Sequence, residues 1–293
     1  MSAADRSVAL VTPSFSGDVE RARLLCETID ARVSNVSHHY ILVDPLDVDL
    51  FRSFEGPRRT VVDERDILPL RFRIVRMRGR RLWLAWSRGF RALRGWHVQQ
   101  LRRIAIAHHV SEPALLYCDS DMAFVRAFDT ADLWQDHRLR LYRVPGGIHD
   151  ALPDAHRDHL RWTRWAHRLN GLSPPAFPAP DYINNLVSWR TDHVRSMCRE
   201  VEDRFGTDWA SAVSRQRSFS ECQIYGAYVS EVRRTVGHWA TERPLCRTYW
   251  SGSSLDEESL REFIAQADAY QVAVGIQSFT RTDIGLIRDV VAP

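Results

Sequence analysis

Two aspartates separated by one residue, directly after an apolar segment, are the clearest chemical signal in the chain. The segment Ala114-Leu-Leu-Tyr-Cys118 is typical of a buried strand, and Asp119-Ser120-Asp121 follows it at once. If the strand continued through the motif, alternation would place both carboxylates on one side. Carboxylate oxygens suit Mg²⁺ or Mn²⁺, which keep positions open for phosphate oxygens. The motif therefore predicts a divalent metal held against a diphosphate, which the metal makes a better leaving group.

A purely structural interpretation of the same motif is also open. One aspartate would then cap a turn, and the other would pair with Arg126. Asp-x-Asp occurs by chance in many chains, so its position after a buried strand is what favours the metal site.

Two further carboxylates in the second half are candidates for acid–base work. Glu221 begins a predicted helix after Ser218-Phe-Ser220, where it could bind an acceptor hydroxyl or take its proton. The helix dipole alone also favours a glutamate there. Asp181, ahead of Tyr182, is a comparable candidate. An inverting transfer requires such a base and a retaining transfer can use the departing phosphate, so the stereochemistry stays open.

A stretch rich in histidine and tryptophan lies between these candidates. It contains His149-Asp150, His156, His159, Trp162, Trp165 and His167. The pair His149-Asp150 is similar to a metal pair of some phosphohydrolases, but the other ligands of such a site are not at recognisable spacings. The stretch therefore predicts an amphipathic helix packed through its rings, and an exposed ring there could stack on a sugar.

Elements that would position these residues alternate in the first half of the chain. We expect strands at Val8–Phe15, Tyr40–Asp44, Thr60–Asp63, Phe72–Val75 and Ala114–Cys118, with helices at 18–32 and 96–109. Alternation of this kind predicts a mostly parallel sheet covered on both faces. Ligands collect at the carboxyl ends of such strands, where Asp44, Asp119 and Asp121 are predicted. Later elements are helices at 191–205, from Ser218 or Ser220, and at 254–269, and a strand at 272–276.

The composition of the 293 residues excludes several classes of chemistry. All 40 basic residues are arginine, so there is no lysine for a Schiff base, a P-loop or a kinase site. A net charge of +3 gives no indication of nucleic acid as a partner. The five scattered cysteines argue against a disulfide framework and are expected in the core.

The sequence also bears on where the chain works. No segment approaches the roughly 20 apolar residues of a membrane span, and no signal peptide is recognisable, which predicts a cytoplasmic protein. Six arginines are concentrated at positions 71, 73, 76, 78, 80 and 81. This cluster is either a solvated strand edge or a patch for an anionic ligand or the headgroups of the inner membrane surface.

Several blocks of the chain, in this order, resemble GT-A glycosyltransferases. They are Gly95-Trp-His-Val-Gln-Gln-Leu101, Leu115-Leu-Tyr-Cys-Asp-Ser-Asp-Met-Ala-Phe-Val-Arg126, Asp181–Trp189 and Phe219-Ser-Glu-Cys-Gln-Ile-Tyr-Gly226. The chain is most similar to a bacterial family of glycosyltransferase-like proteins, over about residues 8–280.

This resemblance implies a fold and a set of roles. The fold would be the GT-A fold, a Rossmann-like, mostly parallel sheet flanked by helices. A single domain, 1–293, would hold a nucleotide-sugar-binding half (1–145) and an acceptor-binding half (146–293). The nucleotide would be bound by Thr12, Pro13 and Ser14, with Asp44 or Asp63 near the base or ribose. Asp119 and Asp121 would form the metal motif, with Asp121 the direct ligand.

One departure from the GT-A pattern concerns the third metal ligand. Many such enzymes use a histidine late in the chain, and no clear motif marks it here. His238 is best placed by its order in the sequence, although a single histidine beside Trp239 is also typical of packing.

The function implied is a metal-dependent transfer, with Mn²⁺ or Mg²⁺, of a sugar from a nucleoside-diphosphate sugar to a glycan or lipid-linked acceptor. Bacterial surface-polysaccharide synthesis is the expected setting, with possible peripheral contact with the membrane. One alternative is a non-catalytic module that binds a sugar nucleotide or glycan. Another is a nucleotidyltransferase or phosphoesterase, for which Thr12–Gly17 is a poor substitute for the usual glycine-rich loop.

Overall fold

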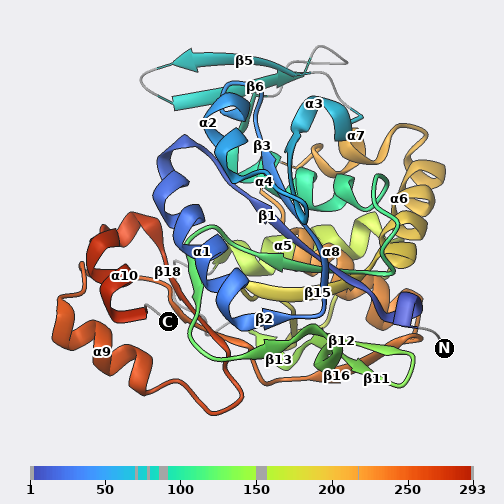
Figure 1. Ribbon diagram of the computed structural model, residues 1–293. Helices are drawn as coiled ribbons and strands as arrows, with labels where there is room; N and C mark the ends of the chain where they lie inside the picture. Colours follow the sequence, from blue (N-terminus) through green and yellow to red (C-terminus); the bar gives the residue numbers. More distant parts are fainter. Residues whose placement is uncertain are drawn as a thin grey trace.

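A central five-stranded sheet organises the protein. The computed structural model describes residues 3–69, 72–77, 80–85, 92–149, 157–216 and 218–291. The sheet, at the centre of Figure 1, has the order β15-β8-β1-β3-β4. Four of its strands are parallel: β1 (Val8–Pro13), β3 (Val36–Val43), β4 (Arg59–Asp63) and β8 (Ala114–Cys118). The edge strand β15 (Leu186–Arg190) runs antiparallel to β8.

Alternate residues of β1 and β8 face opposite sides of this sheet, as the pleat of a strand requires. One face is covered by α1 (Val19–Arg32), whose Leu25 and Ile29 pack on Val8 and Leu10. The other face is covered by α4 (Gly95–Ile106). The residues that share a core with α4 are Ala9, Val11, Leu115 and Tyr117. The apolar runs predicted from the sequence as buried strands are therefore covered on both faces.

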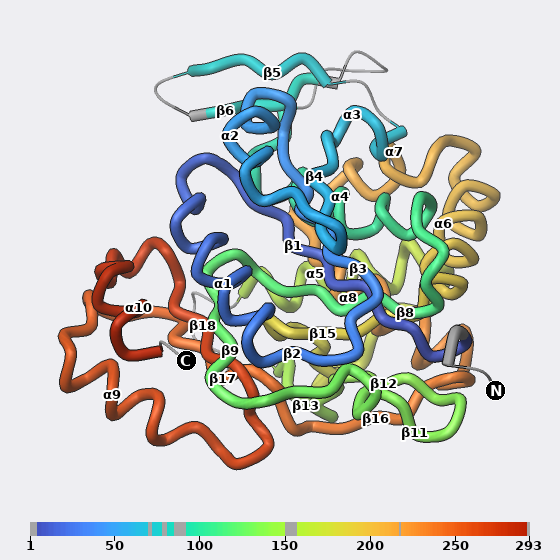
Figure 2. Tube along the Cα trace, viewed as in Figure 1, coloured from blue at the N-terminus to red at the C-terminus, as the bar shows by residue number. Residues whose placement is uncertain are grey.

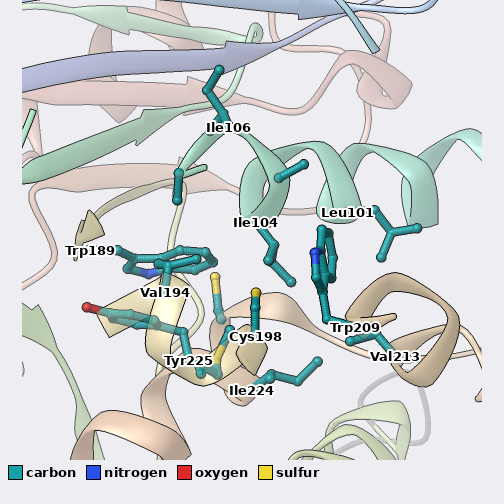
Figure 3. Packing of buried hydrophobic residues seen from close by; sticks show 14 of the residues in the cluster. Leu101, Ile104, Ile106, Trp189, Val194, Cys198, Trp209, Val213, Ile224 and Tyr225 are labelled. Atoms are coloured by element: carbon teal, nitrogen blue, oxygen red, sulfur yellow. The ribbon is translucent and has the colours of Figure 1, made fainter. Parts of the chain in front are cut away.

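The core on the α4 face is the larger one and includes the second half of the chain. Its helices are α5 (Arg157–Leu169), α6 (Thr191–Phe205), α7 (Trp209–Val213) and α8 (Glu221–Ala227). Figure 3 shows Leu101 and Ile104 of α4 beside Trp209, with Trp189 of β15 close to Tyr225 of α8. The rings of Trp189 and Tyr225 stack with their centroids 4.6 Å apart. This packing fixes α8 on the β8–β15 side of the sheet.

Smaller sheets and the C-terminal helices surround the central sheet. An antiparallel sheet of β5 (Phe72–Met77), β6 (Arg80–Ala85) and β7 (Ala92–Arg94) lies at the top of Figure 1. Figure 2 shows β9, β17 and β18 at the side from which α9 and α10 project. The bounds of these elements are β9 (Met122–Phe124), β17 (Cys246–Tyr249), β18 (Ala273–Ile276), α9 (Glu257–Ala265) and α10 (Ile284–Val291).

The remaining elements are short. Another three-stranded sheet consists of β11 (Trp134–Gln135), β12 (Arg138–Tyr142) and β16 (His238–Thr241), and β13 (Val144–Ile148) pairs with β14 (Ala179–Asp181). The others are β2 (Val33–Ser34), β10 (Phe128–Asp129), α2 (Val48–Phe51) and α3 (Glu64–Ile67).

These observations confirm a mixed α/β fold whose mostly parallel sheet is flanked by helices. The five cysteines are buried and free, as predicted. The predicted amphipathic helix is α5, and Trp165 and His167 lie on its buried side. The C-terminal helix α10 and the small sheets around β12 and β17 were not predicted. Among the described residues, no helix is long and apolar enough to cross a membrane.

Candidate functional site

The Asp119-Ser120-Asp121 motif forms a turn at the carboxyl end of β8. The strand ends at Cys118, and the Met122 N–H donates to the Asp119 carbonyl at 3.2 Å. The prediction that both carboxylates lie on one side of a continued strand is therefore wrong, because the chain turns within the motif. Each aspartate has its own set of partners.

Asp119 faces α4, where Arg103 joins it to Glu221. The Arg103 guanidinium donates from Nη2 to Asp119 Oδ1, and from Nη1 to Glu221 Oε1 at 2.7 Å. Arg103 and Glu221 are both buried, and Asp119 is partly buried. One cation thus serves two carboxylates, and the trio carries a net negative charge when both are ionised. We call Asp119, Arg103 and Glu221 the acidic bridge.

The first turn of α8 holds Glu221 in this position. Ser220 caps the helix, and its Oγ accepts from the Gln223 N–H at 3.3 Å, as the sequence predicted for Ser218 or Ser220. The Glu221 N–H donates to Gln100 Oε1 on α4 at 3.0 Å. Gln100 and Arg103, which lie on one face of α4, therefore both bind Glu221 at the start of α8.

Asp121 faces the other way, towards Asp18 and the start of the segment Ser278–Thr280. Its Oδ2 accepts from the Ser278 N–H at 3.1 Å, while its Oδ1 is buried and has no partner among the described residues. Asp18 accepts from Ser120 Oγ at 3.3 Å. Burial and the charge of Asp18 raise the pKa of Asp121 to about 6, and burial raises the pKa of Asp18. We call Asp18 and Asp121 the acid pair.

The acid pair is short of compensating positive charge. Arg21 is the cation whose field reaches both carboxyl groups. Its guanidinium donates instead to the carbonyls of Ile276 at 3.0 Å and Thr282 at 2.8 Å. Asp18 was not among the residues predicted from the sequence. The only local signal was an acid in the loop after the first strand.

Two carboxylates with an unpartnered buried oxygen match the needs of a small hard cation. Mg²⁺ is commonly bound through one or two carboxylates, with water and substrate phosphates in its other positions. No group of three or more His, Cys, Asp or Glu side chains that could hold a metal is found within the described ranges. The residues present therefore fit a cation shared with a phosphate ligand, rather than one enclosed by protein alone.

The three predicted nucleotide-contacting residues on β1 and its loop differ in availability. Thr12 Oγ1 is bound to His39 Nε2 at 2.8 Å inside the sheet, and Pro13 is buried at the strand end. Ser14 is also buried, and its Oγ has no hydrogen-bond partner in the described part of the chain. Of these three residues, Ser14 is therefore the one whose polar side-chain atom can still bind a ligand.

Both predicted ribose or base contacts are engaged within the chain. Asp44, after β3, pairs with Arg81, and its Oδ1 accepts from the Leu46 N–H at 2.8 Å. Arg81 also binds Asp47, so this arginine lies inward. Asp63 caps α3 and pairs with Arg65.

The described arginines of the cluster at 71–81 differ in their surroundings. Arg81 belongs to an internal ion pair with Asp44 and Asp47, whereas Arg73 and Arg76 are exposed residues of β5. Arg71, Arg78 and the side chain of Arg80 lie outside the described residues.

Asp181 lies close to the opposite side of the α8 start. Its Oδ1 accepts from Gln223 Nε2 at 3.0 Å and from the Ile183 N–H at 3.0 Å. Burial raises the pKa of Asp181 from its ordinary value. The first turn of α8 thus carries Glu221 towards α4 and Gln223 towards Asp181, which brings both predicted acid–base candidates near one helix end.

His238 lies at the wrong end of the sheet to bind the same metal ion as Asp121. Its Nε2 is bound at 3.0 Å to the Tyr225 hydroxyl, which also accepts from the Arg190 N–H. Arg190 pairs with Ala114 at the amino end of β8, while Cys118 precedes Asp119 at the other end. Four strand residues span about 13 Å. The prediction of His238 as the third metal ligand is contradicted by this geometry, because order along the chain does not specify the strand end.

His159 and His167, two described histidines of the histidine-rich stretch, are engaged within the chain. His167 is bound to Glu231 at 3.1 Å and to the Ser173 carbonyl at 2.8 Å, and the rings of His159 and Trp162 stack at 4.7 Å. Asp150 and His156 lie outside the described residues.

Residues 7–293 match the model of DUF6492, a family of unknown function, and the chain therefore belongs to that family. No curated protein matches the chain.

Proposed function

We propose that the chain is a metal-dependent glycosyltransferase of the GT-A type, moving a sugar from a nucleoside-diphosphate sugar to a glycan or lipid-linked acceptor. The observation that carries the proposal is the acid pair, Asp18 and Asp121, at the carboxyl end of a parallel sheet. Open α/β sheets bind ligands at this edge. Holding two neighbouring carboxylates without a directly paired cation is unfavourable, so a bound cation accounts for the arrangement better than packing does.

The purely structural interpretation of the motif is weakened by Arg126. Its guanidinium donates to the backbone carbonyls of Gln271 at 2.5 Å and Ala267 at 3.0 Å, and it pairs with neither aspartate of the motif. The turn is closed by the backbone, so it does not need the Asp121 carboxylate as its cap.

Under this proposal Asp121 and Asp18 hold Mn²⁺ or Mg²⁺, which when bound neutralises charge on the departing diphosphate. Asp119 is oriented by Arg103. The Arg103 Nε–H is buried without a partner among the described residues and suits a phosphate oxygen. Ser14 Oγ offers a further hydrogen bond at the same edge. With no lysine in the sequence, arginine is the side chain left for this task.

The two acid–base candidates suit different roles. The Glu221 carboxylate is held by the Arg103 guanidinium at 2.7 Å, and this fixed orientation suits the positioning of a hydroxyl. Asp181 has a raised pKa and lies next to Gln223, so it is the better general base. We assign proton transfer to Asp181 and positioning to Glu221.

One observation also favours the second candidate function, a non-catalytic module that binds a sugar nucleotide or glycan. Arg103 already engages both Asp119 and Glu221, which leaves fewer groups free for chemistry. A glycosyltransferase would cleave the nucleotide-sugar donor, whereas a binding module would bind it without cleavage.

A donor-cleavage assay separates them. The wild-type chain is incubated with UDP-, GDP-, ADP- and dTDP-sugars, with and without Mn²⁺, and released nucleoside diphosphate is measured. We expect Mn²⁺-dependent release from one donor class, reduced about 10²- to 10³-fold by Asp121→Ala, the loss typical of removing one electrostatic contact to a transition state. Asp132→Ala, at an exposed acid, serves as the control. Metal-dependent binding without release would support the binding module, and equal release by Asp121→Ala would contradict the proposed site.

A further inference from the structure

An exposed indole lies at the end of the same α4 stripe that carries the buried polar contacts. Trp96, Gln100 and Arg103 are spaced i, i+4 and i+7, which places them on one face of the helix. Gln100 and Arg103 both bind Glu221. Trp96, one turn nearer the helix start, is 46% exposed. The stripe therefore passes from the acidic bridge to solvent and ends in a large aromatic ring.

The Trp96 ring is supported from a second helix. Its centroid lies 5.5 Å from that of Trp162 on α5, and the planes are tilted by 39°. The Trp162 Nε1–H donates to Ser218 Oγ at 2.6 Å, just before α8. In the same region the rings of His97 and Phe219 lie 5.5 Å apart. The start of α4, the first half of α5 and the segment before α8 thus hold an aromatic surface beside Glu221.

A second observation at this place points to a polar ligand. Gln100 is 2% exposed, and its Nε2 has no hydrogen-bond partner in the described part of the chain, although its Oε1 is bound to the Glu221 N–H. An amide donor held in one orientation beside an exposed ring pairs hydrogen-bonding capacity with a flat apolar face. A pyranose offers the complementary features, hydroxyl groups around its rim and C–H bonds on its face.

We propose that the Trp96 ring, supported by Trp162, is the platform on which a pyranose of the acceptor stacks. The inference rests on the proposed function and names the acceptor as a saccharide. The acceptor hydroxyl then lies near Glu221 and the Gln100 amide.

The side of the sheet distinguishes this platform from a nucleobase site. Ser14 and Asp44, the residues predicted to contact the nucleotide, follow β1 and β3. The platform ring Trp96 lies at the start of α4, and its support Trp162 is bound to the segment before α8. Helix α8 packs on β15 through Trp189 and Tyr225, and β8 with its Asp119 lies between β1 and β15, so we place the acceptor on the β15 side of Asp119 and the nucleotide on the β1 side.

Saturation-transfer NMR with four neutral disaccharides tests the platform directly. The probes are cellobiose, maltose, lactose and N,N′-diacetylchitobiose, added to the full chain without any donor. We expect transfer from the protein to ring C–H protons of at least one probe, and a 10-fold or greater loss of affinity in Trp96→Ala. Trp96→Phe keeps an aromatic face and retains most of the binding. Trp250→Ala, at a tryptophan 49% exposed in the loop after β17, leaves binding unchanged.

A donor measurement on the same variants separates this inference from the proposed function. Thermal stabilisation by nucleoside diphosphates with Mn²⁺ is measured for the wild type and for Trp96→Ala, and we expect equal stabilisation. Loss of nucleotide stabilisation in Trp96→Ala would assign the ring to the donor base and overturn the inference. Disaccharide binding that is absent from the wild type, or equal in Trp96→Ala, would overturn it as well. Absence of nucleotide stabilisation in the wild type would count against the proposed function alone.

Discussion

The two ends of strand β8 differ in how they handle buried ionisable groups. At the carboxyl end, Asp119 and Asp121 lie with Asp18 and Glu221, and Arg103 is the one guanidinium bound to any of these four in the described structure. At the amino end, Ala114 pairs with Arg190, whose N–H is bound by the Tyr225 hydroxyl, and that hydroxyl is bound by His238. One end concentrates negative charge, and the other buries a histidine.

The difference lies in which protonation state burial favours. Desolvation lowers the pKa of His238 to about 3, so this ring is neutral at pH 7 and is bound to a neutral hydroxyl. Desolvation raises the pKa of Asp121 to about 6, so this carboxyl group is still mostly ionised at pH 7. The amino end is therefore stable as it is, whereas the carboxyl end gains from a cation. This contrast indicates that the amino end of β8 is suited to packing and the carboxyl end to binding a ligand.

Removing the shared cation should produce the largest effect. Arg103→Met leaves the buried Glu221 and the partly buried Asp119 without their ion-pair partner, and we expect a loss of about 3 to 5 kcal/mol in the free energy of unfolding. Arg190→Met at the amino end is the matched control. Its ion pair with Asp192 is mostly exposed on the aspartate side, so the expected loss is about 1 kcal/mol or less. Urea unfolding measures both. Equal losses would remove the distinction between the two ends.

Neutralising the acid pair should raise stability. The pKa of Asp121 in the folded chain is above its ordinary value of 3.8, so the folded chain binds more protons between these values. Stability therefore falls as pH rises through this window and stays lower above about pH 6. We expect Asp121→Asn to add about 1 to 3 kcal/mol at pH 8 without metal, and nothing at pH 3.5. A destabilised Asp121→Asn at pH 8 would mean that the carboxylate has a structural role.

The amino end should respond to pH in the opposite direction. The folded chain resists protonation of His238, while the unfolded chain takes the proton near pH 6.5, so stability falls as pH decreases below 6.5. His238→Gln keeps a hydrogen-bonding side chain without the titration. We expect it to remove about 1 kcal/mol of the loss between pH 6.5 and pH 5.5. If His238→Gln loses as much stability between pH 6.5 and pH 5.5 as the wild type, His238 does not cause that loss.

Local sequence signals were sufficient for the elements that frame the carboxyl end. The apolar runs of β1 and β8 and the amphipathic pattern of α4 identify a sheet with helices on it, because burial on two faces leaves few polar positions in such strands. The rule that ligands meet strand ends then located Asp119 and Asp121. Glu221 was found because a serine, Ser218 or Ser220, can cap the helix that this glutamate begins.

Features that depend on distant neighbours could not be predicted in this way. Arg103 is one of many arginines in the sequence, and its role exists only because α8 and the Asp119 turn meet α4. Asp18 gains its meaning from Asp121, 103 residues away. His238 was assigned from chain order, but β16 pairs with β12 and brings it to the amino end of β8. The turn within Asp119–Asp121 is closed by one backbone hydrogen bond, which no residue type in the motif specifies.

The most direct test of the proposed donor site is thermal unfolding with UDP, GDP, ADP and dTDP, each with and without Mn²⁺. A nucleotide at 100 times its Kd should add about 2.7 kcal/mol to stability. We expect this gain from one nucleotide class only with Mn²⁺, its loss in Asp121→Ala and Asp18→Ala, and its retention in Asp132→Ala. Stabilisation by no nucleotide, or equal stabilisation in Asp121→Ala, would contradict the assignment of the acid pair as a metal–diphosphate site.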